Sequence, residues 1–268
     1  SIDAVLIASS TNTHADLLKA AARAGKAVFL EKPIDLSYEV AQEAATVARE
    51  AGVPVMIDLN RRFDASNVAL RDAVSSGEVG DVELVLLCSR GPSLPPIEYL
   101  KVSGGQMRDQ NVHFFDLMCW ITGLEPVSVS AMGSALVDPQ VAEVGDVDTS
   151  VAILTLSNGA LCQIDAQRRI GYGYDERIEV NGSKSMVEAA RQRTGWVNHY
   201  SENQVSTNGL YAGWFERIEP TYRASLNAFV DALDKGEAPS PSLEDGLRAQ
   251  RIAEAATEAL RTGKTIKL

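Results

Sequence analysis

The first 57 residues alternate short apolar runs with alanine-rich segments, and this alternation restricts the fold more than any other feature of the sequence. The apolar runs at residues 2–8, 26–30 and 53–57 predict strands buried on both faces of a sheet. Segments 14–24 and 37–51 have helical spacing, with polar turn residues or glycine at their ends. Because the links are short, the strands should run parallel. The sequence therefore predicts half of a doubly wound α/β sheet, whose ligands bind beyond the carboxyl ends of its strands.

The other half of such a sheet is not evident. A dinucleotide-binding fold opens with a strand, a G-x-G-x-x-G loop and a helix, and the glycines near residues 104 and 171 lack that spacing and setting. The chain also begins almost inside the first apolar run, so we expect an N-terminally truncated, incomplete Rossmann-type sheet. The alternative is a complete smaller fold, which would leave residues 2–8 as a bare apolar sheet edge.

Residues 63–268 follow a different pattern, which predicts an α+β domain with an open, mainly antiparallel sheet. Turn signals separate β-branched or alternating segments, which we expect as strands at 82–89, 127–136, 148–156, 161–166 and 177–181. Ser157-Asn158-Gly159 predicts a tight hairpin between two of these strands. We place the domain boundary after residue 62, giving domains 1–62 and 63–268.

Helical spacing in this second region predicts helices at 64–75, 104–123, 215–235 and 243–262. The two closing helices carry apolar residues at intervals of three and four, which we expect in the core. These residues are Leu226, Phe229, Val230 and Leu233 in the first, and Ile252, Ala255, Ala256 and Leu260 in the second.

The composition excludes some classes of binding partner and indicates the redox state of the cysteines. Twenty-five basic and 36 acidic residues give a formal charge of −11, which argues against binding to nucleic acid or to an anionic membrane. Cys88, Cys119 and Cys162 are widely spaced in apolar runs and are typical of reduced core thiols in a cytoplasmic protein. The three histidines are too scattered to suggest a metal site, and there is no 18-residue apolar run.

The stretch Gly104–Asp116 holds the first group of candidate catalytic residues. Two glycines precede a helical pattern in which Asp109 and His113 lie four residues apart, and therefore on one helix face. A carboxylate beside an imidazole orients the ring, favours its protonated form and prepares it for proton transfer near neutral pH. The alternative is a surface Asp–His pair at the start of a helix.

Glu31-Lys32-Pro33 follows the second apolar run, at the carboxyl edge of the predicted parallel sheet. A lysine at this edge can donate a hydrogen bond to a substrate oxygen and stabilise negative charge that develops there. An ordinary surface turn is the alternative for this short motif.

In this order, the motifs resemble those of the glucose–fructose oxidoreductase/inositol dehydrogenase (Gfo/Idh/MocA) family. The resemblance rests on Ala8-Ser9-Ser10-Thr11-Asn12-Thr13-His14, Glu31-Lys32-Pro33, Asn60-Arg61-Arg62-Phe63-Asp64, and Gly104-Gly105 with Asp109 and His113. The inositol 2-dehydrogenase branch is most similar, through Pro95-Pro96-Ile97-Glu98-Tyr99, Val137-Asp138-Pro139, Gly145-Asp146-Val147-Asp148-Thr149 and Tyr172–Val180. The resemblance implies a Rossmann domain, a sheet domain that joins subunits, and NAD-dependent oxidation of a cyclic polyol, such as myo-inositol to 2-keto-myo-inositol, with NADP not excluded.

The resemblance also implies residue roles. Lys32 contacts the reacting oxygen, His113 takes the hydroxyl proton, and Asp109 positions substrate and imidazole. The cofactor contacts implied are Thr11, Asn12, His14, Glu31, Lys32, Asn60 and Arg61, with helix capping an equal alternative for Thr11 and Asn12. Substrate contacts are implied for Lys32, Arg61, Asp109, Asn111, His113, Tyr172 and Tyr174; for Asp148 a turn role is favoured. The family further implies a cis peptide before Pro33 and a homo-oligomer, dimer or tetramer, formed through the sheet.

Three functions remain open at this point. The first is an NAD-dependent polyol dehydrogenase, and the second is a truncated, inactive family member that acts as a binding or oligomerisation module. The third is a lyase-like relative in which bound NAD is recycled. Asn111 stands where inositol dehydrogenases usually have threonine, and Gly91 where they have aspartate, so the natural polyol can differ.

Overall fold

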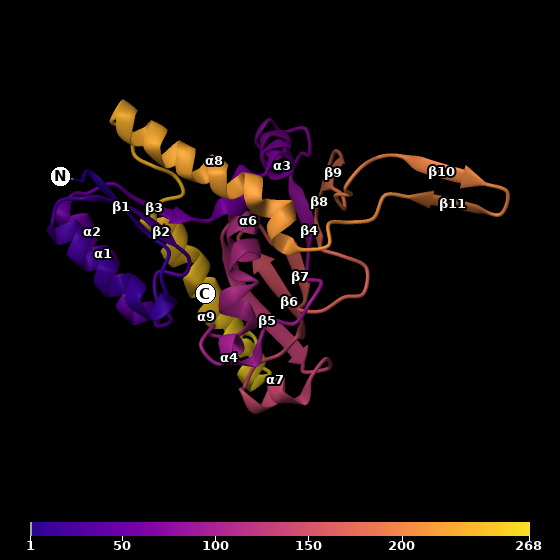
Figure 1. Ribbon diagram of the computed structural model, residues 1–268, viewed down its shortest axis with the longest axis horizontal. Coiled ribbons are helices and arrows are strands. Elements are labelled where there is room, and N and C mark those ends of the chain that lie inside the picture. The colour runs from indigo at the N-terminus through magenta and orange to yellow at the C-terminus, as the bar shows by residue number, and fades with distance from the viewer. Residues whose placement is uncertain (1) are drawn as a thin grey trace.

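A small parallel sheet forms the N-terminal part of the computed structural model, which describes residues 2–268. Its strands are β1 (Ala4–Ile7), β2 (Ala27–Glu31) and β3 (Val55–Asp58), in the order β1-β2-β3. Helices α1 (His14–Arg23) and α2 (Tyr38–Ala51) connect them (Figure 1). The predicted alternation of parallel strands and helices is confirmed, and all three carboxyl ends lie at one edge.

Both faces of this sheet pack against other elements. On one face, alanines of α1 and α2 form a cluster with Leu30 and Ile57, and Leu243 and Leu247 near the C-terminus complete it. On the other face, Phe229 makes an edge contact with Phe29, with ring centroids 5.6 Å apart. The last two helices, α8 (Trp214–Lys235) and α9 (Leu243–Thr262), therefore close the core of the N-terminal sheet.

A seven-stranded sheet forms the larger part of the chain, in the order β12-β5-β6-β7-β4-β8-β9. Only β4 and β7 pair in parallel, so the predicted open, mainly antiparallel sheet is confirmed, including the hairpin between β6 and β7. The strands are β4 (Val82–Arg90), β5 (Pro126–Ser134), β6 (Thr149–Leu156), β7 (Leu161–Gln167), β8 (Asp175–Gly182), β9 (Met186–Ala189) and β12 (Ile266–Lys267).

Helices cover only one face of this sheet. Helices α3 (Ala65–Ser75), α6 (Val112–Thr122) and α9 pack there around a core that includes Phe115, Met118 and Ile252. On the other face, residues such as Met132, Ile153 and Leu161 stay exposed. We call this side the open face; it includes Met132, Val151, Ile153, Leu161, Gln163 and Asp165.

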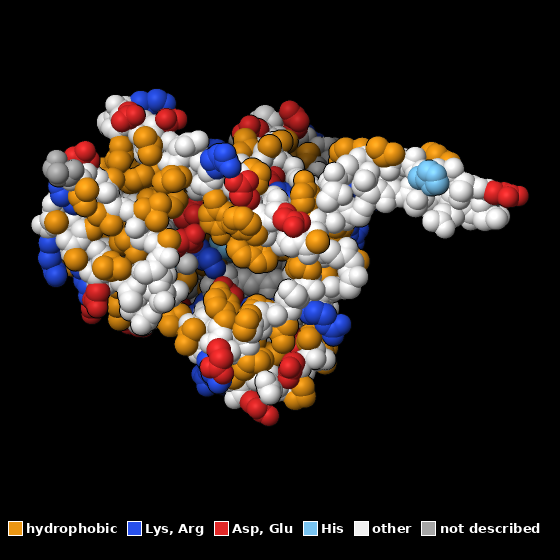
Figure 2. Space-filling model, viewed as in Figure 1, with side chains coloured by type: hydrophobic (Ala, Val, Ile, Leu, Met, Phe, Trp, Pro, Cys, Tyr) orange, Lys and Arg blue, Asp and Glu red, His pale blue; other side chains and the backbone are white. Residues whose placement is uncertain are grey.

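Short elements lie around these two sheets. They are the 3-10 turns η1 (Thr11–Thr13) and η2 (Asn60–Phe63), and the short helices α4 (Ile97–Leu100), α5 (Gln106–Asp109) and α7 (Pro139–Glu143). The hairpin of β10 (Asn198–Ser201) and β11 (Gln204–Thr207) projects away from the body (Figure 1). Hydrophobic side chains line this hairpin (Figure 2), and Trp196, Tyr200 and Val205 are exposed.

Three expectations about local structure are wrong. The first strand is not buried on both faces, because Ile7 is buried whereas Leu6, whose side chain lies on the opposite face of β1, is 53% exposed. Leu226 and Val230 are exposed, because Phe229 is the residue that α8 directs into the core. The segment 104–123 is not one helix but two, with α5 ending at Asp109 and α6 beginning at Val112.

None of the helices in residues 2–268 is long and apolar enough to cross a membrane.

Candidate active site

The side chain of Lys32 reaches from the end of β2 to the end of α5. Its Nζ donates to the main-chain oxygen of Asp109 at 2.7 Å and to Asp109 Oδ1 at 3.4 Å. An ammonium group has three N–H donors. Asp109 therefore uses two of them, and the third is available to a ligand oxygen.

The carboxylate of Asp109 is held on both sides. Oδ1 accepts from the hydroxyl of Tyr99 at 2.8 Å, and Oδ2 accepts from Nη1 of Arg168 at 3.1 Å. Burial alone would raise the pKa of Asp109, but the charges of Lys32 and Arg168 and the hydrogen bonds hold it below its ordinary value. Asp109 is therefore an ionised residue whose direction is fixed.

His113 lies in the first turn of α6 and is 7% exposed. Its Nδ1 is buried and has no hydrogen-bond partner among residues 2–268. Burial and the nearby charges of Arg61 and Lys32 lower the pKa of His113 well below its ordinary 6.5. At neutral pH the imidazole is uncharged and can accept a proton.

The expected contact between Asp109 and His113 is wrong. The helix is interrupted at Gln110 and Asn111, where the N–H of Asn111 donates to the carbonyl of Gln106, five residues back, and no hydrogen bond joins Asp109 to His113 within residues 2–268. Asp109 turns toward Lys32, Tyr99 and Arg168 instead. As a result, His113 lacks the carboxylate that would have favoured its protonated form.

Arg61 supplies a second buried cation. Its Nη1 donates to Asn60 Oδ1 at 2.9 Å, its Nη2 to the Tyr174 hydroxyl at 3.4 Å and its Nε to Glu176 Oε1 at 3.4 Å. Tyr174 in turn donates to Glu176. Burial would lower the pKa of Arg61, but Tyr174 and Glu176 raise it above its ordinary value, so the guanidinium stays charged. The structure thus brings Arg61, Asn60 and Tyr174 together.

The remaining residues predicted to bind a cofactor lie at the carboxyl edge of the small sheet. Thr11 and Asn12 are in η1, directly after β1, and Asn12 is exposed. Glu31 ends β2, and its carboxylate accepts from the main-chain N–H of Lys32. His14 is buried, with Nδ1 2.8 Å from the Pro33 carbonyl and Nε2 3.0 Å from the Ser9 carbonyl. His14 therefore fixes the loop around the Lys32–Pro33 bond, which is cis as expected.

Two residues predicted to contact substrate have hydrogen-bond partners within the protein. Asn111 is completely buried beneath the break between α5 and α6, with its amide nitrogen 3.3 Å from the sulfur of Met107. The hydroxyl of Tyr172 joins Arg90 and Asp175, whose strand pairing puts them on the open face of the large sheet. Asp148 has the favoured turn role, since its Oδ2 accepts from the main-chain N–H groups of Leu136 and Val137.

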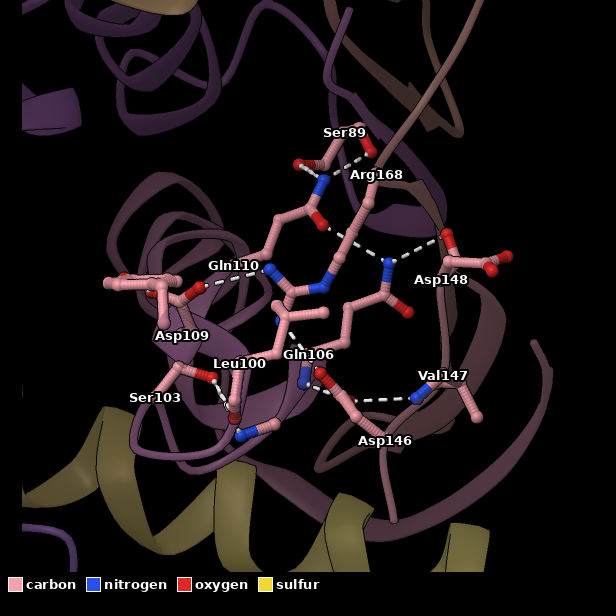
Figure 3. A network of polar contacts seen from close by, with 12 residues as sticks. Ser89, Leu100, Ser103, Gln106, Asp109, Gln110, Asp146, Val147, Asp148 and Arg168 are labelled. Carbon is pink, nitrogen blue, oxygen red and sulfur yellow. Dashed lines mark hydrogen bonds and ion pairs between the residues drawn. The ribbon is translucent and has the colours of Figure 1, made fainter. Parts of the chain in front are cut away.

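Residue patterns did not identify Tyr99, Arg168, Gln106 or Asp146 as parts of this site. Figure 3 shows the last three in a network behind Asp109, where Arg168 also donates to Asp146 Oδ2 at 3.1 Å. Tyr99 and Asp146 do fall in segments that resemble inositol dehydrogenases, and that resemblance is the signal that could have found them. The Arg168-Arg169 pair gave no local signal.

Family models account for nearly the whole chain. Residues 1–59 match the model described as "Oxidoreductase family, NAD-binding Rossmann fold", and residues 71–268 match "Oxidoreductase family, C-terminal alpha/beta domain". The chain belongs to the Gfo/Idh/MocA oxidoreductase family. By family it is an NAD-binding oxidoreductase, as the ordered motifs predicted.

Similar proteins of this family include inositol dehydrogenases. The inositol 2-dehydrogenase of Rhizobium meliloti is 40% identical over 267 residues, which are 100% of this chain and 81% of that protein. The myo-inositol 2-dehydrogenase of Thermotoga maritima is also 40% identical, over 100% of this chain and 80% of its own length. The scyllo-inositol dehydrogenase of Lactobacillus casei, solved with NAD(H) and scyllo-inositol, is 28% identical, with a TM-score of 0.91 over 100% of this chain and 80% of its own. The chain thus spans about four fifths of these Gfo/Idh/MocA relatives.

Proposed function

We propose that this protein oxidises one hydroxyl of a cyclic polyol to a ketone with NAD, and that myo-inositol, converted to 2-keto-myo-inositol, is the substrate. One observation carries the proposal: Lys32 has one N–H that Asp109 does not use, and the charge of this lysine helps to hold the pKa of buried His113 well below its ordinary value, so an N–H donor and a neutral base are both present. Figure 2 shows a hollow between the two halves of the molecule, with acidic and basic side chains on its walls.

Lys32, His113 and Asp109 have different roles in the proposed reaction. Lys32 donates its third N–H to the substrate hydroxyl oxygen and stabilises the negative charge that develops there. His113 accepts the hydroxyl proton, for which its uncharged form is required. Asp109 positions Lys32 through its carbonyl and carboxylate, rather than the imidazole. Bound NAD supplies the acceptor for the hydride that leaves the carbinol carbon.

The carboxyl edge of the small sheet fits the nicotinamide end of this cofactor. Thr11 and the exposed Asn12 offer polar groups there, and Glu31 offers a carboxylate that accepts hydrogen bonds from hydroxyls. Arg61, which follows β3 at the same edge, donates to the Tyr174 hydroxyl, and Asn60 and His14, both buried, hold Arg61 and the Lys32 loop in place. The similar scyllo-inositol dehydrogenase solved with NAD(H) favours NAD over NADP.

Calorimetry with NAD, followed by absorbance at 340 nm with myo-inositol, tests the proposal. Binding and polyol-dependent reduction are expected, with glucose and scyllo-inositol as comparison substrates. A folded sample that binds NAD but reduces none with any polyol would contradict the proposed reaction. A folded sample that binds no NAD would favour a binding or oligomerisation module.

We also infer that residues 1–62 form the cofactor domain, that residues 63–268 form the substrate and subunit-contact domain, and that copies of the chain associate through the open face. Met132, Val151, Ile153 and Leu161 are exposed together on one face of β5, β6 and β7. An exposed apolar patch of this kind is typical of a protein–protein contact. Paired faces would give a dimer, and a second contact would give a homotetramer. The three buried free cysteines suit a reducing, cytoplasmic compartment.

A further inference from the structure

Four charged groups of alternating sign form a line behind the candidate active site. Lys32, Asp109, Arg168 and Asp146 follow one another, with nitrogen–oxygen distances of 3.4, 3.1 and 3.1 Å. The side chain of Arg168 is only 3% exposed, and that of Asp146 only 5%. Such buried charges are stable only when they are paired, so each link depends on the next.

We propose that Arg168 is a positioning residue of this site, which holds Asp109 so that Lys32 keeps one N–H free for the substrate oxygen. The proposal rests on the proposed dehydrogenase function, and it assigns a role to a residue that touches neither substrate nor cofactor. Arg168 acts through Asp109.

Arg168 is fixed at its far end by the main chain. Asp146, its second partner, accepts at Oδ1 from the N–H groups of Gln106 and Val147, each at 2.8 Å. Gln106 is the first residue of α5, so Asp146 ties Arg168 to the start of the helix that Asp109 ends. The N–H of Arg168 itself donates to the carbonyl of Asp148 at 2.8 Å. The guanidinium is therefore anchored at a strand end and at the start of α5.

Two glutamine amides fix the other side of the same short helix. Gln110 Nε2 donates to the carbonyl and hydroxyl of Ser89 at 2.9 and 3.1 Å and to the carbonyl of Gln167 at 3.2 Å. Gln106 Nε2 donates to Gln110 Oε1 and to the carbonyl of Asp148 (Figure 3). The place where the helix breaks is thus bound to the carboxyl ends of β4 and β7, next to Arg168.

The distances at Lys32 show what this arrangement achieves. The short bonds of the Asp109 carboxylate go to Tyr99 at 2.8 Å and Arg168 at 3.1 Å, whereas Lys32 Nζ lies 3.4 Å from it. The short bond of Lys32 goes to the neutral carbonyl of Asp109 at 2.7 Å. Without Arg168, Oδ2 would be free to turn, and the carboxylate would pair tightly with the ammonium that should serve the substrate.

Competitive acetylation of the whole chain with limiting acetic anhydride, read by mass spectrometry, tests this role without cofactor or substrate. Since only the neutral amine reacts, tighter pairing of Lys32 with Asp109 should slow its labelling relative to the other lysines. For Arg168→Gln at pH 8 we expect Lys32 labelling to fall by roughly 3- to 10-fold. In an Asp109→Asn background, the same change should alter labelling by less than about twofold, because Arg168 then has no carboxylate to hold.

Arg169→Gln is the matched control, since it removes the same charge from the adjacent, exposed residue; it should label like the native chain. Arg168→Lys keeps the positive charge and should fold more readily than Arg168→Gln. A lysine ammonium cannot hold the carboxylates of Asp109 and Asp146 as the planar guanidinium does, so Lys32 labelling should again fall by at least about twofold. Unchanged Lys32 labelling in either Arg168 variant, or an equal loss in the Asp109→Asn background, would overturn the proposal.

Steady-state kinetics separates this role from the reaction itself. If the native chain oxidises a polyol, Arg168→Gln should lower kcat by more than about 10-fold and change KM by less than about threefold, since Lys32 acts on the developing charge. An inactive native chain would refute the proposed reaction, while the labelling result would still decide whether Arg168 positions Lys32. A higher KM with an unchanged kcat would contradict the positioning role.

Discussion

Lys32 Nζ lies 2.7 Å from the main-chain oxygen of Asp109, a residue 77 positions away in the sequence. One ammonium group therefore joins the loop after β2 of the small sheet to the end of α5. Through this bond the loop after β2 is set against the break between α5 and α6, and His113 is the second residue of α6. The chemistry proposed for this protein depends on that junction.

Removing the amine of Lys32 should abolish most of the turnover. We expect Lys32→Met to lower kcat/KM for the polyol by at least ~10²-fold, because the developing negative charge on the oxygen loses its hydrogen-bond donor. Reduction of NAD at 340 nm measures the effect. Lys264→Met, at an exposed lysine, is the matched control and should retain native activity. Equal activity of the two variants would remove Lys32 from the mechanism.

The acid side of the pH–rate profile should reflect His113. Its pKa lies well below 6.5 because of burial and the charges of Arg61 and Lys32, so the imidazole stays neutral and competent as a base well into the acid range. We expect kcat/KM to stay level as pH falls through 6.5 and to decline only below it. His113→Gln should lose at least ~10²-fold in kcat. A decline centred at or above pH 6.5 would show that Asp109 or another carboxylate stabilises the protonated ring.

Stability above neutral pH should depend on Asp58. Burial and the charge of Glu31, which faces it from β2, raise the pKa of Asp58 from 3.8 to about 8. The folded state therefore holds a proton that the unfolded state has lost between about pH 4 and 8, so the free energy of unfolding falls as pH rises through that window.

Asp58→Asn imitates the neutral acid, and its unfolding midpoint in urea should change less between pH 6 and pH 9 than that of the native chain. At pH 9 the variant should be the more stable of the two. Asp72→Asn, at an exposed aspartate, serves as the control and should follow the native chain. A native midpoint that is constant over this range would contradict the raised pKa.

A charge on the open face should separate subunits. Ile153 is 49% exposed on that face, and Val230 is 48% exposed on α8. Ile153→Lys places an ammonium in an apolar contact, so we expect it to lower the mass measured by light scattering to that of a smaller assembly. Val230→Lys makes the same substitution at the same exposure, away from the open face, and should leave the assembly intact. Identical masses for both variants would exclude the open face as the contact.

Much of the fold follows from local sequence. The strands at 26–30 and 53–57 were placed within one or two residues, because continuous apolar runs between polar turns leave few alternatives for a buried strand. The hairpin at Ser157–Gly159 and both long closing helices were also predicted correctly. Short strands such as β9 and β12 were missed, since only pairing with a neighbour makes strands of two to four residues.

The candidate site was less predictable, because its geometry depends on distant contacts. The spacing of Asp109 and His113 fits a continuous helix. No neighbouring residue in the sequence indicates the break, which occurs where Gln110 donates hydrogen bonds to β4 and β7. Arg168 lies 59 and 22 positions from its two carboxylate partners, and no pattern of neighbours reveals such pairs. Lys32 was found because it directly follows a predicted strand at the ligand-binding edge.

Helix α9 gives the chain an unusual order of folding during synthesis. Leu243 and Leu247 complete the core of a sheet made by the first 58 residues, and Gly246 fits against Ile57 so closely that a Cβ would lie 2.9 Å from it. A ribosome therefore releases the N-terminal sheet long before the residues that close its core. The apolar surface of the nascent sheet therefore stays uncovered, and open to chaperones, until Leu243 and Leu247 have emerged.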